Sequence, residues 1–116
     1  MKHEHVEYMK LALAEAKKAG QFNEVPVGAI LVSETGQVLA ATQNRTITDL
    51  DPTAHAEILA LRQAAFKINN YRLLNTTLYV TVEPCPMCMG AAIHARVSRV
   101  IFLISAPSIS PWAGPS

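Results

Sequence analysis

The 116-residue chain lacks the features that mark several large classes of protein. Its 10 basic and 9 acidic residues nearly balance, so the composition gives no sign of a nucleic-acid surface, and only a local basic patch could provide one. Its two cysteines are too few for a secreted disulfide scaffold. No segment is long and apolar enough to span a membrane, and the polar N-terminus is unlike a signal peptide. We therefore expect a cytoplasmic protein with no membrane partner.

Aliphatic residues dominate what the chain does contain. Half of the residues are hydrophobic but only 6% are aromatic, so the core must consist mainly of alanine, valine, isoleucine and leucine. The length points to one domain that buries a single core.

Hydrophobic periodicity and turn residues predict seven secondary-structure elements. The first is an amphipathic helix over residues 4–19, with Val6, Met9, Leu13 and Ala16 on its buried face and Gly20 at its end. Further helices are expected at residues 52–67 and 86–95, and strands at residues 25–32, 38–42, 77–82 and 97–104. The order α-β-β-α-β-α-β predicts an α/β layered domain whose first two strands form a hairpin.

His55 and Glu57 lie near the start of the second predicted helix. They follow Pro52 and Thr53, which we expect to begin and cap that helix. Residues two apart within a helix point in nearly opposite directions. His55 and Glu57 can therefore share a site only if that site lies off the N-terminus of the helix.

Cys85 and Cys88 lie at the junction of the third predicted strand and the third predicted helix. Their spacing places both on one side of the first helical turn, and a helix N-terminus lowers the pKa of a thiol. Two thiolates and the imidazole of His55 would give Zn²⁺ three protein ligands. A fourth position would remain for water, as in catalytic zinc sites.

Such a site has a definite chemistry. Zinc lowers the pKa of its bound water to about 7, so hydroxide could attack an electron-poor ring carbon that bears an amino group. Ammonia leaves only if it is protonated, and Glu57 is the candidate that would carry the proton from water to it. His-x-Glu together with Pro-Cys-x-x-Cys is a signature of zinc nucleobase deaminases.

Each half of the pattern has a plainer interpretation when it is taken alone. A lone Cys-x-x-Cys could be a redox pair, half of a zinc finger or two core cysteines. A lone His55 would more often be a satisfied histidine at a helix start. His94 is expected to have a packing or surface role, His3 and His5 to be solvated, and Glu83 to be structural.

Four longer blocks narrow the interpretation further. They read Glu-Val-Pro-Val-Gly-Ala (24–29), Asp-Pro-Thr-Ala-His-Ala-Glu (51–57), Asn-Tyr-Arg-Leu (70–73) and Thr-Leu-Tyr-Val-Thr-Val-Glu-Pro-Cys-Pro-Met-Cys (77–88). With these blocks the chain closely resembles bacterial tRNA adenosine deaminases, which convert the wobble adenosine of an arginine tRNA anticodon to inosine. The resemblance runs from about residue 5 to about residue 102.

The resemblance implies a three-layer α-β-α sandwich of the cytidine-deaminase type and a homodimer. It also implies one Zn²⁺ per chain on His55, Cys85 and Cys88, with Glu57 as the catalytic residue. The partner would be tRNA, whose anticodon loop would present a flipped-out adenosine for attack at C6.

Three substrate-binding residues also follow from the resemblance. Asn44 matches a position that contacts the substrate base, and Val27 and Ala54 would line the same pocket. Asparagine is also common in loops, so from composition alone Asn44 is nearly as well explained as an ordinary loop-forming residue.

The resemblance ends after the fourth predicted strand. Leu103 stands where the family usually has glycine, and the last strand and helix of the family are not matched. We therefore divide the chain into a zinc-dependent deaminase domain, residues 1–104, and an atypical tail rich in proline and serine, residues 105–116. A frameshifted or truncated reading frame is our hypothesis, and sequencing the gene beyond codon 103 tests it.

Three functions compete at this point. The first is deamination of adenosine in tRNA, and the second is deamination of another aminated base, such as cytosine or guanine. The third is a zinc-binding chain without turnover. A redox role for Cys-x-x-Cys would leave His55 and Glu57 unexplained.

Overall fold

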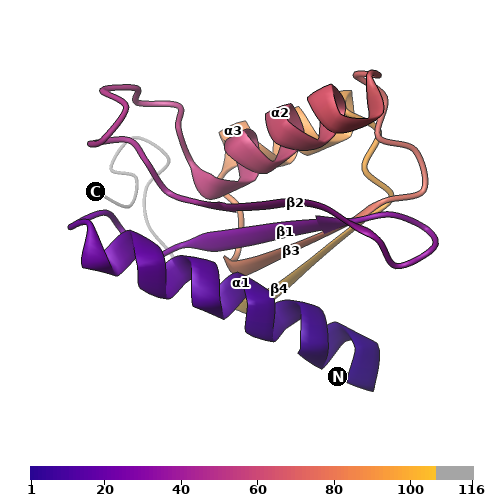
Figure 1. Ribbon diagram of the computed structural model, residues 1–116, viewed down its shortest axis with the longest axis horizontal. Coiled ribbons are helices and arrows are strands. Elements are labelled where there is room, and N and C mark those ends of the chain that lie inside the picture. The colour runs from indigo at the N-terminus through magenta and orange to yellow at the C-terminus, as the bar shows by residue number, and fades with distance from the viewer. Residues whose placement is uncertain (107–116) are drawn as a thin grey trace.

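The computed structural model describes residues 1–106, and the predicted tail lies outside the described residues from residue 107 onward. Seven elements follow one another in the expected order (Figure 1): α1 His3–Gln21, β1 Gly28–Val32, β2 Val38–Gln43, α2 Ala56–Ile68, β3 Thr77–Val82, α3 Pro86–His94 and β4 Arg99–Ile104. Within residues 1–106, no helix combines the length and the hydropathy needed to cross a membrane.

The four strands form one mixed sheet in the order β2-β1-β3-β4. β1 pairs antiparallel with both β2 and β3, whereas β4 pairs parallel with β3. β2 and β3 therefore run in the same direction, and their C-terminal ends lie at the same end of the sheet. The chain enters α2 and α3 from that end of the sheet.

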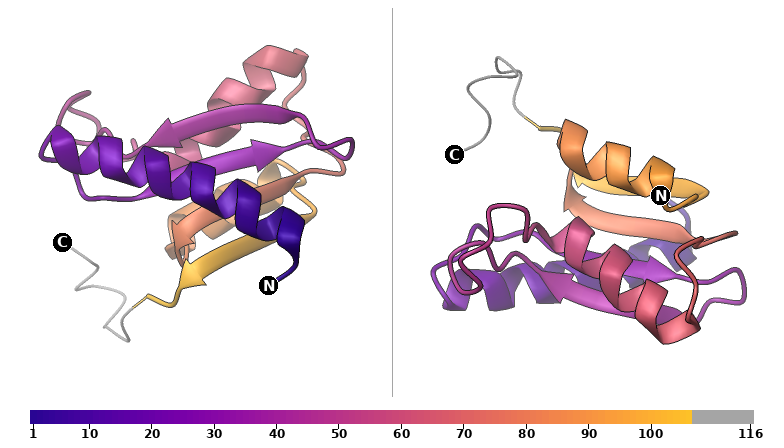
Figure 2. Two further views of the ribbon diagram at one scale, coloured as in Figure 1. Left: turned by 60° about the horizontal axis from the view of Figure 1, so that its bottom comes forward. Right: turned by 90° about the horizontal axis from the view of Figure 1, so that it is seen from above.

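Helices cover both faces of the sheet. α1 lies along one face, and α2 and α3 lie side by side on the opposite face (Figure 2). The predicted three-layer α-β-α sandwich is thus confirmed. One core cluster lies under α2, where Ala60 and Ala64 pack on Leu31 and Leu78, and the second lies under α1.

The buried face of α1 is made mainly of small residues. Met9, Ala12, Ala16 and Ala19 are buried, but Leu13 is 44% exposed, so its predicted place on this face is wrong. The helix also runs past Gly20 to Gln21 and ends before a residue with positive φ at position 23. Small side chains let the helix backbone approach the sheet closely.

β1 begins three residues later than predicted. Pro26 has no N–H to donate to a ladder, and the N–H of Val27 donates to the carbonyl of Val25 at 2.8 Å. This tight turn takes residues 25–27 out of the sheet. They are then available to line the cavity described below.

The two edge strands of the sheet, β2 and β4, differ in how far other parts of the chain cover them. Along β2, Gln63 Oε1 accepts a hydrogen bond from the Ala41 N–H at 2.9 Å, and Lys67 Nζ donates to the Val38 carbonyl at 3.4 Å. No further strand pairs with β4 among residues 1–106, and Leu103 and Ile104 on it are exposed. Side chains of α2 thus cover one edge, while the other presents an apolar strand.

At Gly28 the backbone of α1 lies close to the sheet, and substitution of this glycine should be costly. A Cβ there would lie 2.0 Å from the Ala12 carbonyl oxygen and 2.5 Å from the Ala16 nitrogen, both backbone atoms. We expect Gly28→Ala to lower the free energy of unfolding in urea by roughly 3 kcal/mol, because α1 must move away from β1.

Gly90→Ala is the matched control, because a Cβ at that helical position meets nothing within 4 Å. It should raise the free energy of unfolding by about 0.5–1 kcal/mol. Equal effects of the two substitutions would contradict the close approach of α1 to β1.

Candidate metal centre and cavity

The start of α2 differs from the prediction, and the difference shapes the site. Asp51 Oδ1 accepts hydrogen bonds from the backbone N–H and the hydroxyl of Thr53, and the His55 N–H donates to the Thr53 carbonyl at 2.8 Å. These turns compete with helix over residues 51–54. The helix therefore begins at Ala56, with His55 as its extended N-cap residue, and the predicted start at Pro52 with a Thr53 cap is wrong.

α3 begins in the same way. Cys85 is its extended N-cap residue, Pro86 occupies the first helical position, and Cys88 follows within the first turn. Neither His55 nor Cys85 makes a side-chain capping hydrogen bond, so both side chains can project beyond the helix ends. The prediction that both motifs sit at helix N-termini is confirmed.

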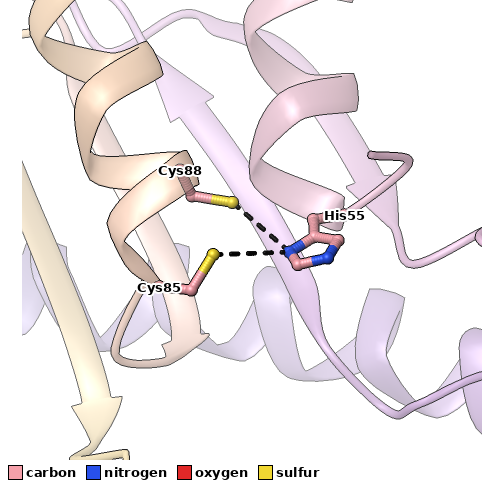
Figure 3. Close-up of side chains that lie close together, drawn as sticks. All are labelled: His55, Cys85 and Cys88. Carbon is pink, nitrogen blue, oxygen red and sulfur yellow. Dashed lines mark hydrogen bonds between the residues drawn. The ribbon is translucent and has the colours of Figure 1, made fainter. Parts of the chain in front are cut away.

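The two helix starts bring three potential metal ligands together. His55 Nδ1 lies 3.5 Å from Cys88 Sγ and 3.7 Å from Cys85 Sγ (Figure 3). Neither cysteine is in a disulfide. In residues 1–106 this is the one group of three histidine, cysteine or acidic side chains with ligand atoms all within 4.8 Å of one another.

These distances fit a tetrahedral zinc ion. Zn–S bonds of about 2.3 Å and Zn–N bonds of about 2.0 Å at tetrahedral angles separate nitrogen from sulfur by about 3.5 Å. One imidazole and two thiolates are also among the ligand sets that catalytic zinc sites use in proteins. The protein supplies three ligands, as catalytic sites do.

Burial governs the ionisation of the groups around this centre. It raises the pKa of the Cys88 thiol, and the charges of Glu57 and Cys85 raise it further. This burial acts against the thiolate form that the helix N-terminus is expected to favour at Cys88. A divalent cation supplies the positive charge that a buried thiolate needs.

Glu57 lies in the first turn of α2 and is only 4% exposed. Burial raises the pKa of its carboxyl group, and its backbone hydrogen bond, Cys88 and His55 act in the opposite direction. Glu57 thus stands beside the ligand group, as the His-x-Glu spacing predicts.

A cavity of about 230 Å³ opens beside His55, Glu57 and Cys85. This is slightly below the usual range for small-molecule pockets, roughly 300–1,000 Å³, and suits a single planar ring system. Its other lining residues are apolar or neutral except for one carboxylate: Val25, Val27, Val82, Asn44, Thr46 and Glu83.

The structure separates the three residues that were predicted to bind substrate. Val27 and Asn44 line the cavity, whereas Ala54 is completely buried and does not line it. Four lining residues escaped the prediction: Val25, Val82, Thr46 and Glu83, the last of which was expected to be structural. Val25, Thr46 and Glu83 lie in loops that the sequence pattern does not fix, whereas Val82 ends strand β3.

The remaining histidines are less uniform than expected. His3 is exposed, but His5 is half-buried, and its Nδ1 lies 2.6 Å from the Tyr79 hydroxyl, so its predicted solvation is wrong. His94 is exposed and lines a groove between α2 and α3, in agreement with a packing or surface role.

Glu24 organises the loop that carries Asn44 and Thr46. It is 5% exposed, and its carboxylate accepts hydrogen bonds from the N–H of Ile47, from both the N–H and the hydroxyl of Thr48, and from the hydroxyl of Thr46. Burial alone would raise the pKa of Glu24, but these hydrogen bonds together lower it. No pattern in the sequence marks this role, because all the partners lie more than 20 residues away.

Comparison with known proteins assigns the chain to a family. Residues 2–104 match the cytidine and deoxycytidylate deaminase zinc-binding region, and the chain belongs to this family. A tRNA-specific adenosine deaminase of Haemophilus influenzae is 53% identical over 94 residues, which are 81% of this chain and 54% of that protein. The family uses zinc, and the His55, Cys85 and Cys88 group fits one Zn²⁺.

Solved structures agree with this assignment. One, from a study of A-to-I editing by tRNA:A34 deaminases at the wobble position of transfer RNA, has a TM-score of 0.85 and 45% identity, and the match covers 88% of this chain and 73% of that one. A guanine deaminase from Bacillus subtilis has a TM-score of 0.83 and 38% identity, with 90% and 66% covered. The chain spans only about half of the curated relatives' length, 54% for the Haemophilus influenzae protein.

The hydrogen bonds of Glu24 predict a dependence of stability on pH. Because the folded state lowers the pKa of Glu24, its charge stabilises the fold above the unfolded-state pKa, about 4.3. This contribution is lost as the pH falls through the lower, folded-state pKa.

We therefore expect wild type to be more stable than Glu24→Gln at pH 7, with the difference narrowing towards pH 3. Urea unfolding of both proteins across this range measures it. A difference that stays constant with pH would show that the charge of Glu24 contributes nothing.

Proposed function

We propose that this protein catalyses the zinc-dependent hydrolytic deamination of adenosine to inosine at the wobble position of tRNA. The observation that carries the proposal is the convergence of His55, Cys85 and Cys88, with sulfur–nitrogen distances of 3.5 and 3.7 Å, beside a buried carboxylate and a cavity sized for one base. Relatives that share about half of its residues are named tRNA-specific adenosine deaminases.

In this proposal His55, Cys85 and Cys88 hold the ion. When bound, Zn²⁺ supplies a Lewis acid that makes water a nucleophile near neutral pH. Glu57 accepts one proton from the attacking water as the C6–O bond forms and delivers it to the adenine ring nitrogen N1. It then takes the remaining proton of that oxygen and delivers it to the amino group, so that the C6–N bond breaks, ammonia leaves and a C6 carbonyl remains. The buried position of Glu57 on the cavity wall supports this role, because a proton held there is shielded from bulk water.

The cavity wall supports a role for Val27 and Asn44 in binding the base. Val27 offers an apolar surface to a ring face, and Asn44 offers an amide. Ala54 contributes indirectly, because it is buried next to His55 and its carbonyl accepts a hydrogen bond from the Arg45 N–H at 3.0 Å. An arginine tRNA is the proposed partner, since that is the substrate which the resemblance implies.

An assay on an anticodon stem-loop tests the proposal. We expect the zinc-loaded 116-residue chain to form inosine at the wobble position of an arginine tRNA stem-loop and to release one ammonia per inosine. Glu57→Gln should retain zinc but lose roughly 10²- to 10⁴-fold in kcat, the usual contribution of a general acid–base. Cys88→Ala should lose the metal and much of the stability.

Three results would contradict the proposal in different ways. Zinc bound at one per chain without ammonia release would indicate a metal-stabilised chain without turnover. Ammonia release from guanine or cytidine but not from the stem-loop would indicate another aminated base, a result that the guanine deaminase likeness makes worth testing. Full activity of Glu57→Gln would remove the proton-shuttle role.

We further propose that the protein is a cytoplasmic homodimer. An apolar groove of about 390 Å³ lies between α2 and α3, and Ile93 on α3 is 63% exposed. The family resemblance implies a homodimer, and we assign the second copy of the chain to this face. Sedimentation equilibrium should show a dimer at micromolar concentration and a weaker one for Ile93→Lys, and a monomer for wild type would contradict this.

A further inference from the structure

The two peptide units between His55 and Glu57 are each held by a side chain from the end of β2. Asn44 Oδ1 accepts a hydrogen bond from the Ala56 N–H at 2.9 Å, and the Thr42 hydroxyl donates to the Ala56 carbonyl at 2.7 Å. We call these two bonds the Ala56 clamp. Ala56 is completely inaccessible to solvent, and Thr42 and Asn44 are 8% and 7% exposed.

The clamp lies between the residues that the chemistry requires. His55 is the N-cap residue of α2 and has no side-chain capping bond of its own, so the end of the helix would otherwise be free to fray. Holding the N–H and the carbonyl of the residue between them sets the relative orientation of His55 and Glu57. Hydrogen bonds that orient metal ligands typically change metal affinity or activity by about 10- to 100-fold.

We infer that Thr42 is a positioning residue for the proposed reaction: its hydroxyl fixes the Ala56 carbonyl and thereby the geometry of His55 and Glu57. The inference rests on the proposed function, since it assumes that His55 binds the metal. Thr42 does not line the cavity, so it acts only through Ala56.

Loss of the Thr42 hydroxyl should affect geometry more than stability. The Ala56 carbonyl is in the first turn of α2 and keeps its helical hydrogen-bond partner four residues on. Valine has nearly the shape of threonine, so Thr42→Val leaves no cavity. Removing this hydroxyl therefore frees the orientation of the peptide without leaving an unpaired carbonyl.

Thr76 provides a matched control in the same chain. It is 2% exposed, and its hydroxyl donates to the Leu73 carbonyl at 2.6 Å. It precedes β3, at the end of that strand opposite to Cys85. Thr76→Val thus removes the same kind of buried hydroxyl-to-carbonyl bond far from the proposed metal.

The experiment measures Co²⁺ and Zn²⁺ dissociation constants of the full chain by chelator competition, with the cobalt–thiolate absorption band as a signature of ligand geometry. We expect Thr42→Val to weaken binding roughly 10-fold, to alter the band and to lower kcat on the stem-loop with KM unchanged. Thr76→Val should match wild type in metal affinity, in the absorption band and in kcat. Thr42→Ser keeps the hydroxyl and should restore the wild-type values of all three quantities. If Thr42→Val does not fold, Thr42→Ala and Thr42→Ser give the same comparison.

Each result decides the inference. Weaker metal binding by Thr42→Val but not by Thr76→Val, with rescue by serine, supports it. Equal behaviour of the two valine variants overturns the positioning role and leaves the metal centre standing. A wild-type chain that binds neither ion overturns the proposed function and the positioning role with it.

Discussion

The site depends on one constraint, which is that β2 and β3 run in the same direction. Both strands pair antiparallel with β1, so their C-terminal ends lie at the same end of the sheet, and the helices that follow them start there. His55 and the two cysteines are 30 or more residues apart in sequence and meet only through this arrangement. The donor set is therefore a product of the whole sheet, and neither motif can build it alone.

The same arrangement buries two ionisable groups of the site, and burial disfavours their charged forms. Cys88 is completely buried and Glu57 nearly so, and burial raises the pKa of both groups. Two negative charges near each other in such a place are unfavourable without a cation. Metal binding and folding are consequently coupled. The ligands come together only in the folded chain, and the positive charge of the ion makes their ionised forms favourable.

Local signals in the sequence were strong enough to predict most of this. The short β-branched run at 77–82 is a strand with those bounds, and both chemical motifs lie at helix starts. The errors arise where distant or competing hydrogen bonds decide. The turn built by Asp51 delays α2, and the hydrogen bonds of Asn44 and Thr42 to Ala56 join segments 12 and 14 residues apart. No periodicity reports such bonds, so the clamp and the cavity-lining positions of Val25, Thr46, Val82 and Glu83 are seen only in the structure.

The amide of Asn44 also has only one possible orientation. A backbone N–H can only donate, so the atom that faces Ala56 must be the amide oxygen, and a flipped amide would set two donors against each other. The polar group that Asn44 has left for the cavity is its NH₂. Asn44 therefore acts as a hydrogen-bond donor towards the cavity. A bound molecule with an acceptor atom at that point can form a hydrogen bond with it. The hydrogen bond within the fold thus determines which polar group this one lining residue offers to a molecule in the cavity.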